Sequence, residues 1–96
     1  MKVVLAPVAE RDIERLMDFL DVKSARAAAK LGVAFERTFQ MMSDHPRIGR
    51  ATLDGSARLL VTRYSRKSSY IVRYRVLDAY ILVTRIWHSK EGRPVE

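Results

Sequence analysis

The sequence predicts an α+β domain in which a twisted antiparallel sheet carries a helical hairpin on one face. Three observations predict it: a short β-prone run opens the chain, helical periodicity follows, and three strand-like runs fill the second half. A chain of 96 residues suits one domain spanning 1–96. The expected order of elements is β-α-α-β-β-β.

The first half of the chain is expected to supply one strand and both helices. The run KVVLAP (2–7) is β-prone and ends in proline, which favours an edge strand. Apolar residues then recur with helical spacing from Ile13 to Leu20, which predicts an amphipathic helix over 9–22. Ser24 can cap a second helix. The apolar face of that second helix comprises Ala28, Leu31, Phe35, Phe39 and Met42.

The second half is expected to form a three-stranded antiparallel meander. The string HPRIGR ends the second helix, because Pro46 disfavours helical geometry in the residue before it and Gly49 permits a turn. Polar segments separate the runs that follow. These strand-like runs are RLLVTRY (58–64), YIVRYRV (70–76) and YILVTRIW (80–87).

Alternation within the central strand indicates which face the helices cover. The tyrosines and valines of 70–76 would point to one side of the sheet, whereas Arg73 and Arg75 would point to the other. Burying two unpaired arginines beneath helices would be costly. We therefore expect the tyrosines and valines to face the hairpin and the arginines to mark the uncovered face.

Positive charge is concentrated in the second half of the chain. Residues 1–44 hold seven basic and seven acidic side chains, whereas residues 45–96 hold eleven basic and four acidic ones, which gives the net charge of +7. This imbalance indicates a nucleic acid or an acidic protein as partner. The alternative is a solvated basic surface that keeps the protein in solution.

Outward-facing aromatic and basic residues are the candidates for target binding. In the last strand, the same alternation turns Ile86 inward and leaves Arg85 and Trp87 outward. An exposed tryptophan beside arginines suits a protein interface, and it also suits bases that stack on aromatic rings. The candidate target-binding residues are Arg58, Arg63, Arg73, Arg75, Arg85, Trp87 and His88.

The sequence predicts neither a cofactor nor a metal site. It contains no cysteine, and it shows no metal-ligand spacing, phosphate-cradling glycine loop or nucleophile–base arrangement. It also lacks an apolar run long enough for a membrane span, and its N-terminus does not resemble a secretory signal. We expect a cytoplasmic protein that does not bind membranes.

Three strings, HPRIGR, YIVRYRV and ILVTRIWHSKEGR, resemble in their order and spacing the RelE/ParE superfamily of type II toxin–antitoxin systems. The resemblance covers nearly the whole chain. It implies a sheet packed on a helical hairpin, and an acidic antitoxin that binds through a helix and an extended segment in a hetero-oligomer. The expected antitoxin contacts are Leu16, Leu20, Phe35 and Phe39.

The resemblance leaves two activities to distinguish. RelE-like members cleave mRNA in the ribosomal A site, whereas ParE-like members lack the nuclease residues and some inhibit DNA gyrase. Here Ile71 follows Tyr70 where RelE-like members often carry an arginine, and Thr62 and Tyr64 stand near the places of their lysines. The tail also lacks a tyrosine. These departures favour a non-catalytic, ParE-like inhibitor of an essential target such as gyrase.

Two alternatives remain beside this interpretation. If the protein is a ribosome-dependent endoribonuclease, Arg73, Arg85 and His88 are its candidate catalytic residues, with His88 the group near them that titrates close to neutral pH. We interpret His88 first as a structural residue at a strand end. The second alternative is a degenerate relative that binds its antitoxin and has lost toxicity.

Overall fold

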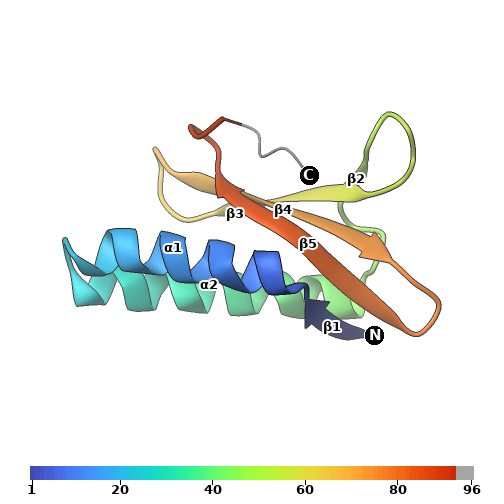
Figure 1. Ribbon diagram of the computed structural model, residues 1–96, viewed down its shortest axis with the longest axis horizontal. Helices are drawn as coiled ribbons and strands as arrows, with labels where there is room; N and C mark the ends of the chain where they lie inside the picture. Colours follow the sequence, from blue (N-terminus) through green and yellow to red (C-terminus); the bar gives the residue numbers. More distant parts are fainter. Residues whose placement is uncertain (93–96) are drawn as a thin grey trace.

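Two long helices lie against one face of a five-stranded sheet in the computed structural model, which describes residues 1–92 (Figure 1). The predicted α+β fold with a helical hairpin on one face is confirmed. No helix in this described part of the chain is both long and apolar enough to cross a membrane. The helices are α1 (Pro7–Asp21) and α2 (Ala25–Asp44), and the strands are β1 (Lys2–Leu5), β2 (Arg50–Ala51), β3 (Arg58–Arg63), β4 (Ser69–Val76) and β5 (Tyr80–His88).

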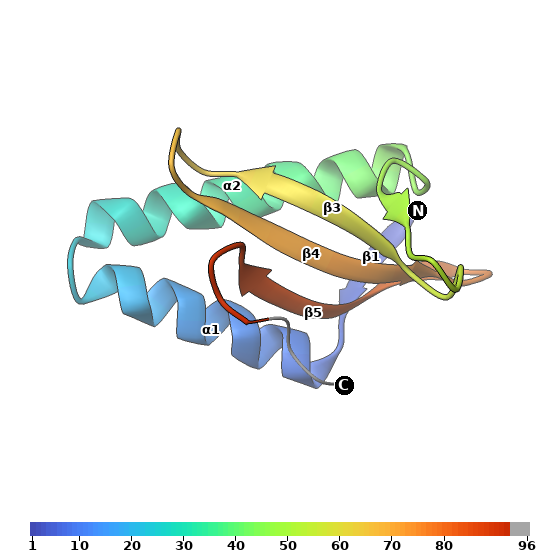
Figure 2. The same cartoon turned by 90° about the horizontal axis from the view of Figure 1, so that it is seen from above.

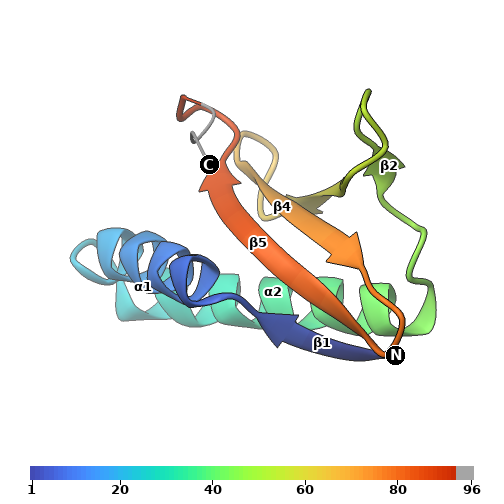
Figure 3. The same ribbon diagram turned by 45° about the vertical axis from the view of Figure 1, so that its right-hand side comes forward.

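The strand order in the sheet is β1-β5-β4-β3-β2, so the first strand of the chain lies beside the last (Figure 3). Strands β2 to β5 pair antiparallel, as expected for a meander. Strand β1 pairs parallel with β5, from Lys2 opposite Tyr80 to Leu5 opposite Val83. The sheet is therefore mixed rather than wholly antiparallel. The two-residue strand β2 is a further element that the sequence pattern did not indicate.

The helical hairpin is built from local signals that the sequence carries. Helix α1 begins at Pro7, whose missing N–H is tolerated at the first helical position. Ser24 caps α2 as predicted, since its Oγ accepts a hydrogen bond from the Ala27 N–H at 3.2 Å. The short connection makes α1 and α2 run antiparallel beneath the sheet (Figure 2).

The core lies between the hairpin and the inward face of the sheet. In β4, Tyr70, Val72 and Tyr74 are buried, whereas Arg75 is exposed and Arg73 is partly exposed. The predicted orientation of the central strand is therefore confirmed. Other members of the buried core cluster are Ala9, Leu16, Leu31, Phe35, Met42, Ile81, Val83 and Ile86.

The HPRIGR string forms a loop that is fixed to the sheet by a buried tyrosine. The Tyr74 hydroxyl accepts a hydrogen bond from the Gly49 N–H at 2.8 Å and donates one to the Pro46 carbonyl at 2.9 Å. A Cβ on Gly49 would lie 2.7 Å from that hydroxyl, so only glycine fits without a shift. From β3, Arg58 Nη1 donates to the Arg47 and Gly49 carbonyls at 3.2 and 2.7 Å. These contacts set the path of the chain from α2 into β2.

Candidate functional site

The side of the sheet turned away from the helices, called the outer face below, combines arginines with apolar side chains. Val61 lies opposite Ile71 in the neighbouring strand, and Ile71 lies opposite Trp87. Val61 is 56% exposed. The surface is therefore partly apolar, whereas the sequence had suggested a mainly cationic one. The outer face comprises Leu59, Val61 and Arg63 of β3, Ile71, Arg73 and Arg75 of β4, and Leu82 and Trp87 of β5.

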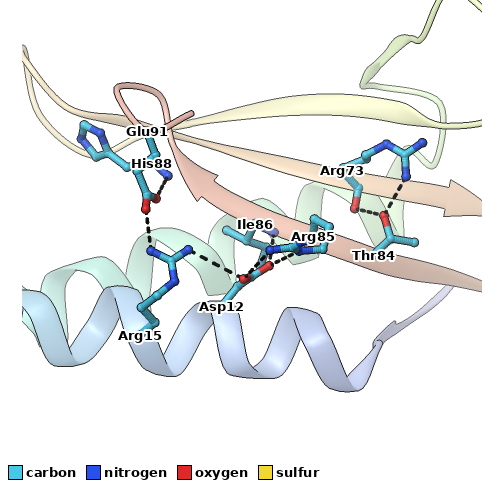
Figure 4. A network of polar contacts seen from close by, with 8 residues as sticks. All are labelled: Asp12, Arg15, Arg73, Thr84, Arg85, Ile86, His88 and Glu91. Atoms are coloured by element: carbon cyan, nitrogen blue, oxygen red, sulfur yellow. Dashed lines mark hydrogen bonds and ion pairs between the residues drawn. The ribbon is translucent and has the colours of Figure 1, made fainter. Parts of the chain in front are cut away.

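A β-bulge fixes the middle of the outer face. Arg73 pairs with Arg85 and Tyr74 pairs with Val83, so Thr84 is an extra residue in β5. The Thr84 hydroxyl donates to the Arg73 carbonyl at 3.2 Å and accepts from Arg73 Nη1 at 3.4 Å (Figure 4). The backbone and the guanidinium of Arg73 are thereby held to the same neighbouring residue.

Arg85 does not present a solvated charge, because it pairs with a buried aspartate of α1. Arg85 Nε and Nη2 donate to the Asp12 carboxylate at 2.9 and 3.2 Å, and the Ile86 N–H donates to the same group at 2.9 Å (Figure 4). Strand β1 ends at Leu5, so the Asp12 carboxylate accepts a backbone N–H of β5 beyond the reach of β1. The expectation that Arg85 is available on the outer face is therefore wrong.

The carboxylate of Asp12 is held in its charged form. Burial raises the pKa of Asp12, but the hydrogen bonds from Arg85 and Ile86 and the charges of Arg85 and Arg15 outweigh burial, so the pKa lies below its ordinary value. Arg15 Nη2 lies 3.7 Å from Asp12 Oδ1, and Arg15 Nη1 donates to Glu91 Oε2 at 2.6 Å. Helix α1 is thus linked both to the end of β5 and to the turn that follows it.

The role of Asp12 as a buried ion-pair partner was not identified from the sequence. Its position carried a signal, because Asp12 follows Ala9 by three residues and precedes Leu16 by four. Both neighbours belong to the buried stripe of α1. An ionisable residue in the apolar register of a helix predicts a buried partner.

Trp87 is buried, which corrects the expectation of an exposed tryptophan. Its side of β5 was predicted correctly, since it lies opposite Ile71 on the outer face. Only 7% of the residue is accessible, however. Its indole is therefore not free to stack on a base or to enter a pocket of a partner.

His88 lies on the side of the sheet that faces the helices. It pairs with Tyr70, and the two ring centroids are 5.0 Å apart in an edge-to-face arrangement. His88 Nδ1 accepts the Lys90 N–H at 3.0 Å, and Nε2 lies 3.4 Å from Ser68 Oγ. The His88 N–H donates to Glu91 Oε1 at 2.8 Å (Figure 4). These contacts fit a structural residue at a strand end, and they do not bring the imidazole to Arg73.

Arg58 and Arg63 lie on opposite sides of β3. Thr62 is buried opposite Tyr70, and Arg58 shares its side of the strand, where it donates to the loop after α2. Arg58 is therefore not on the outer face, contrary to expectation. Arg63 lies on the outer face and is exposed.

The four residues expected to contact an antitoxin differ in accessibility. Leu16 and Phe35 are 5% and 3% exposed members of the core, so they cannot form a docking surface in this fold. Leu20 and Phe39 are partly buried and pack against that core. Phe39 also lines a groove of about 370 Å³ beside β1. The other residues lining that groove are Val3, Glu36, Gln40 and Ser43.

Residues 1–92 hold no cluster of three or more His, Cys, Asp or Glu that could bind a metal ion. The arginines of the outer face can bind anionic or aromatic groups. Charged and apolar groups that lie side by side on one surface suit recognition of a macromolecule. Arg63, Arg73 and Arg75 are the basic side chains that β3 and β4 place on this face.

Known proteins resemble this chain along most of its length. The family model described as the ParE toxin of the type II toxin–antitoxin system parDE matches residues 3–92. The chain is 35% identical over 91 residues to Toxin RelE1 of Caulobacter vibrioides, which covers 95% of this chain and 96% of that protein. A solved chain from the chromosomal ParDE system of P. aeruginosa shares the fold, with a TM-score of 0.70, 17% identity and coverage of 90% of this chain and 92% of that one.

Proposed function

Because this chain belongs to the ParE toxin family of type II toxin–antitoxin systems, we propose that it inhibits an essential cytoplasmic target by binding through the outer face. DNA gyrase is the proposed target. The whole chain acts as one toxin domain, and a cognate antitoxin neutralises it in a hetero-oligomer. No chemical step is assigned to the protein in this proposal.

The separation of His88 from Arg73, together with the ion pair that occupies Arg85, carries the proposal. Cleavage of RNA by its own 2′-hydroxyl needs a group that takes a proton and a group that returns one, both close to the same phosphate. The His88 ring packs on Tyr70 on the helix side, and Arg85 is neutralised by Asp12. Without a converging acid–base set, inhibition by binding is the simpler function for the outer face.

The antitoxin is proposed to bind at the hairpin and at the free edge of β1. Strand β1 ends the sheet, so its second edge can accept an extended segment. The groove lined by Phe39 lies beside that edge and offers apolar contact. Phe19 and Val22, near the tip of the hairpin, are 63% and 89% exposed and add further apolar surface for a partner helix. Acidic residues of the antitoxin would be attracted by the net charge of +7.

An assay of DNA supercoiling by purified gyrase tests the proposed target. The wild-type protein should block supercoiling, and Arg75→Glu should raise the concentration needed by about tenfold, because a cationic anchor becomes an acidic one. Arg37→Glu on α2 is the matched control, since it reverses the charge of an arginine exposed on a helix. Full gyrase activity at molar excess of the wild-type protein would contradict this target.

A ribosome-dependent nuclease is the second candidate, and two observations favour it. Arg73 and Arg85 lie opposite each other on neighbouring strands, where two cations can approach one phosphate if Asp12 releases Arg85. The Caulobacter relative carries the name Toxin RelE1. Cuts in mRNA in a translating extract, lost in Arg73→Gln, would select this function. A protein that leaves both gyrase and mRNA unaffected but binds its antitoxin would be the degenerate relative.

A further inference from the structure

A small cavity lies away from the outer face, where the chain passes from α2 into the sheet. Its volume is about 130 Å³. That is enough for a small ion and well below the roughly 300–1,000 Å³ of pockets that hold larger ligands. Arg58 and Val76 share the helix-facing side of their strands, so the cavity is separate from the outer face. It is lined by Arg47, Ala51, Gly55, Ser56, Ala57, Arg58 and Val76.

The two arginines in the wall differ in how firmly they are held. Arg58 is anchored, because its Nη1 donates to the Arg47 and Gly49 carbonyls. Its Nε and Nη2 have no hydrogen-bond partner among residues 1–92. Arg47 is exposed, and it contributes its carbonyl rather than its side chain to these contacts. One guanidinium is therefore positioned in advance, while the other remains free to move toward a ligand.

No carboxylate within residues 1–92 pairs with either arginine. Asp54 belongs to the loop that contributes Gly55 and Ser56 to the wall, but it is not itself a lining residue. Asp54 Oδ1 accepts hydrogen bonds from the Thr52 hydroxyl, the Ser56 N–H and the Ser56 hydroxyl at 2.7, 3.0 and 2.8 Å. These donors are neutral and come from its own loop, and Asp54 forms no ion pair with Arg47 or Arg58 within residues 1–92.

We propose that this cavity is a binding site for a small oxyanion, with phosphate as the ligand class. Guanidinium groups bind phosphate oxygens through pairs of charge-assisted hydrogen bonds. A tetrahedral dianion can be approached by Arg47 and Arg58 together, and its two negative charges match their two positive ones. Both free phosphate and the terminal phosphate of a nucleotide offer this chemistry.

Calorimetric titration of the full chain with inorganic phosphate at constant ionic strength tests the site. We expect saturable binding to one site with a Kd on the order of 1 mM. Arg47→Gln should weaken it by about fivefold, because it removes one charge-assisted partner. Arg50→Gln is the matched control, since Arg50 is also exposed and close in sequence but does not line the cavity. Amide resonances of 55–58 should shift during the titration.

Two results would overturn the proposal. One is the absence of saturable binding, and the other is an equal loss in Arg47→Gln and Arg50→Gln, which would indicate a diffuse basic surface. Adenosine 5′-monophosphate distinguishes the two possible sources of the phosphate group. If it competes with inorganic phosphate for the cavity, a nucleotide phosphate is supported. If it does not bind while inorganic phosphate does, the free ion is supported. Since Arg47 lies outside the outer face, the test is independent of gyrase inhibition.

Discussion

Neighbouring residues of β4 point to opposite faces of the sheet, and the two faces differ in side-chain type and in exposure. Tyr70, Val72 and Tyr74 on the helix side are at most 4% exposed. Arg73 and Arg75 on the other side remain at least partly accessible. The inner face of β4 contributes side chains to the core, whereas Arg73 and Arg75 do not. This difference shows why toxin activity and stability can be probed with substitutions in the same strand.

The sharpest test of the two-face comparison uses neighbouring residues. Tyr74→Ala should lower the free energy of unfolding by about 4 kcal/mol, because it leaves a cavity and removes the anchor of the loop after α2. Arg75→Ala should change it by less than about 0.5 kcal/mol, since the side chain is exposed. Urea unfolding followed by circular dichroism measures both. Equal losses of unfolding free energy would contradict the conclusion that the inner face, and not the outer face, stabilises the fold.

The next largest effect is expected at Asp12, where an ion pair crosses from the hairpin to the sheet. Asp12→Ala should destabilise the protein by about 3 kcal/mol, because Arg85 and the Ile86 N–H lose their shared acceptor. Asp18→Ala is the control, as Asp18 is exposed on the same helix. A loss at Asp12 no larger than that at Asp18 would contradict the structural role of the pair.

The same pair gives stability a dependence on pH. The pKa of folded Asp12 lies below its unfolded value of about 3.9. Its contribution is therefore fully present above that unfolded value, and it is lost as the pH falls through the folded pKa. The difference in unfolding free energy between wild type and Asp12→Asn should stay constant from pH 7 to about pH 5 and shrink below about pH 4. A difference that persists unchanged at pH 2.5 would contradict this.

Much of the fold could be predicted because alternation and periodicity are local. The pattern of 70–76 showed which side of the central strand is buried, and Ser24 marked the start of α2. The parallel pairing of β1 with β5 could not be predicted in this way. It joins the two ends of the chain, and nothing within KVVLAP specifies the direction of a partner so far along the sequence.

The candidate site was predicted less well, because charge alone does not say what a side chain contacts. Arg85 donates to Asp12, and Arg58 donates to backbone carbonyls. Neither acceptor can be identified from the local sequence, so both arginines were predicted to be surface charges. Trp87 is on the expected side of its strand but is covered. Arg63 and Arg75 were placed correctly, since each lies exposed on the outer face. Whether such a side chain is accessible depends on partners that are distant in sequence, rather than on residue type.

A smaller loss of stability is expected at Gly49, and it tests whether the loop after α2 depends on the inner face. Gly49→Ala should cost about 2 kcal/mol, because the new Cβ would lie 2.7 Å from the Tyr74 hydroxyl oxygen and 3.0 Å from the Leu59 carbonyl. In a Tyr74→Phe background the cost should fall, since the hydroxyl is gone, but the ring and the carbonyl remain close. Gly92→Ala, with open space around it, is the control. Strictly additive effects in this double-mutant cycle would show that the glycine and the hydroxyl do not interact.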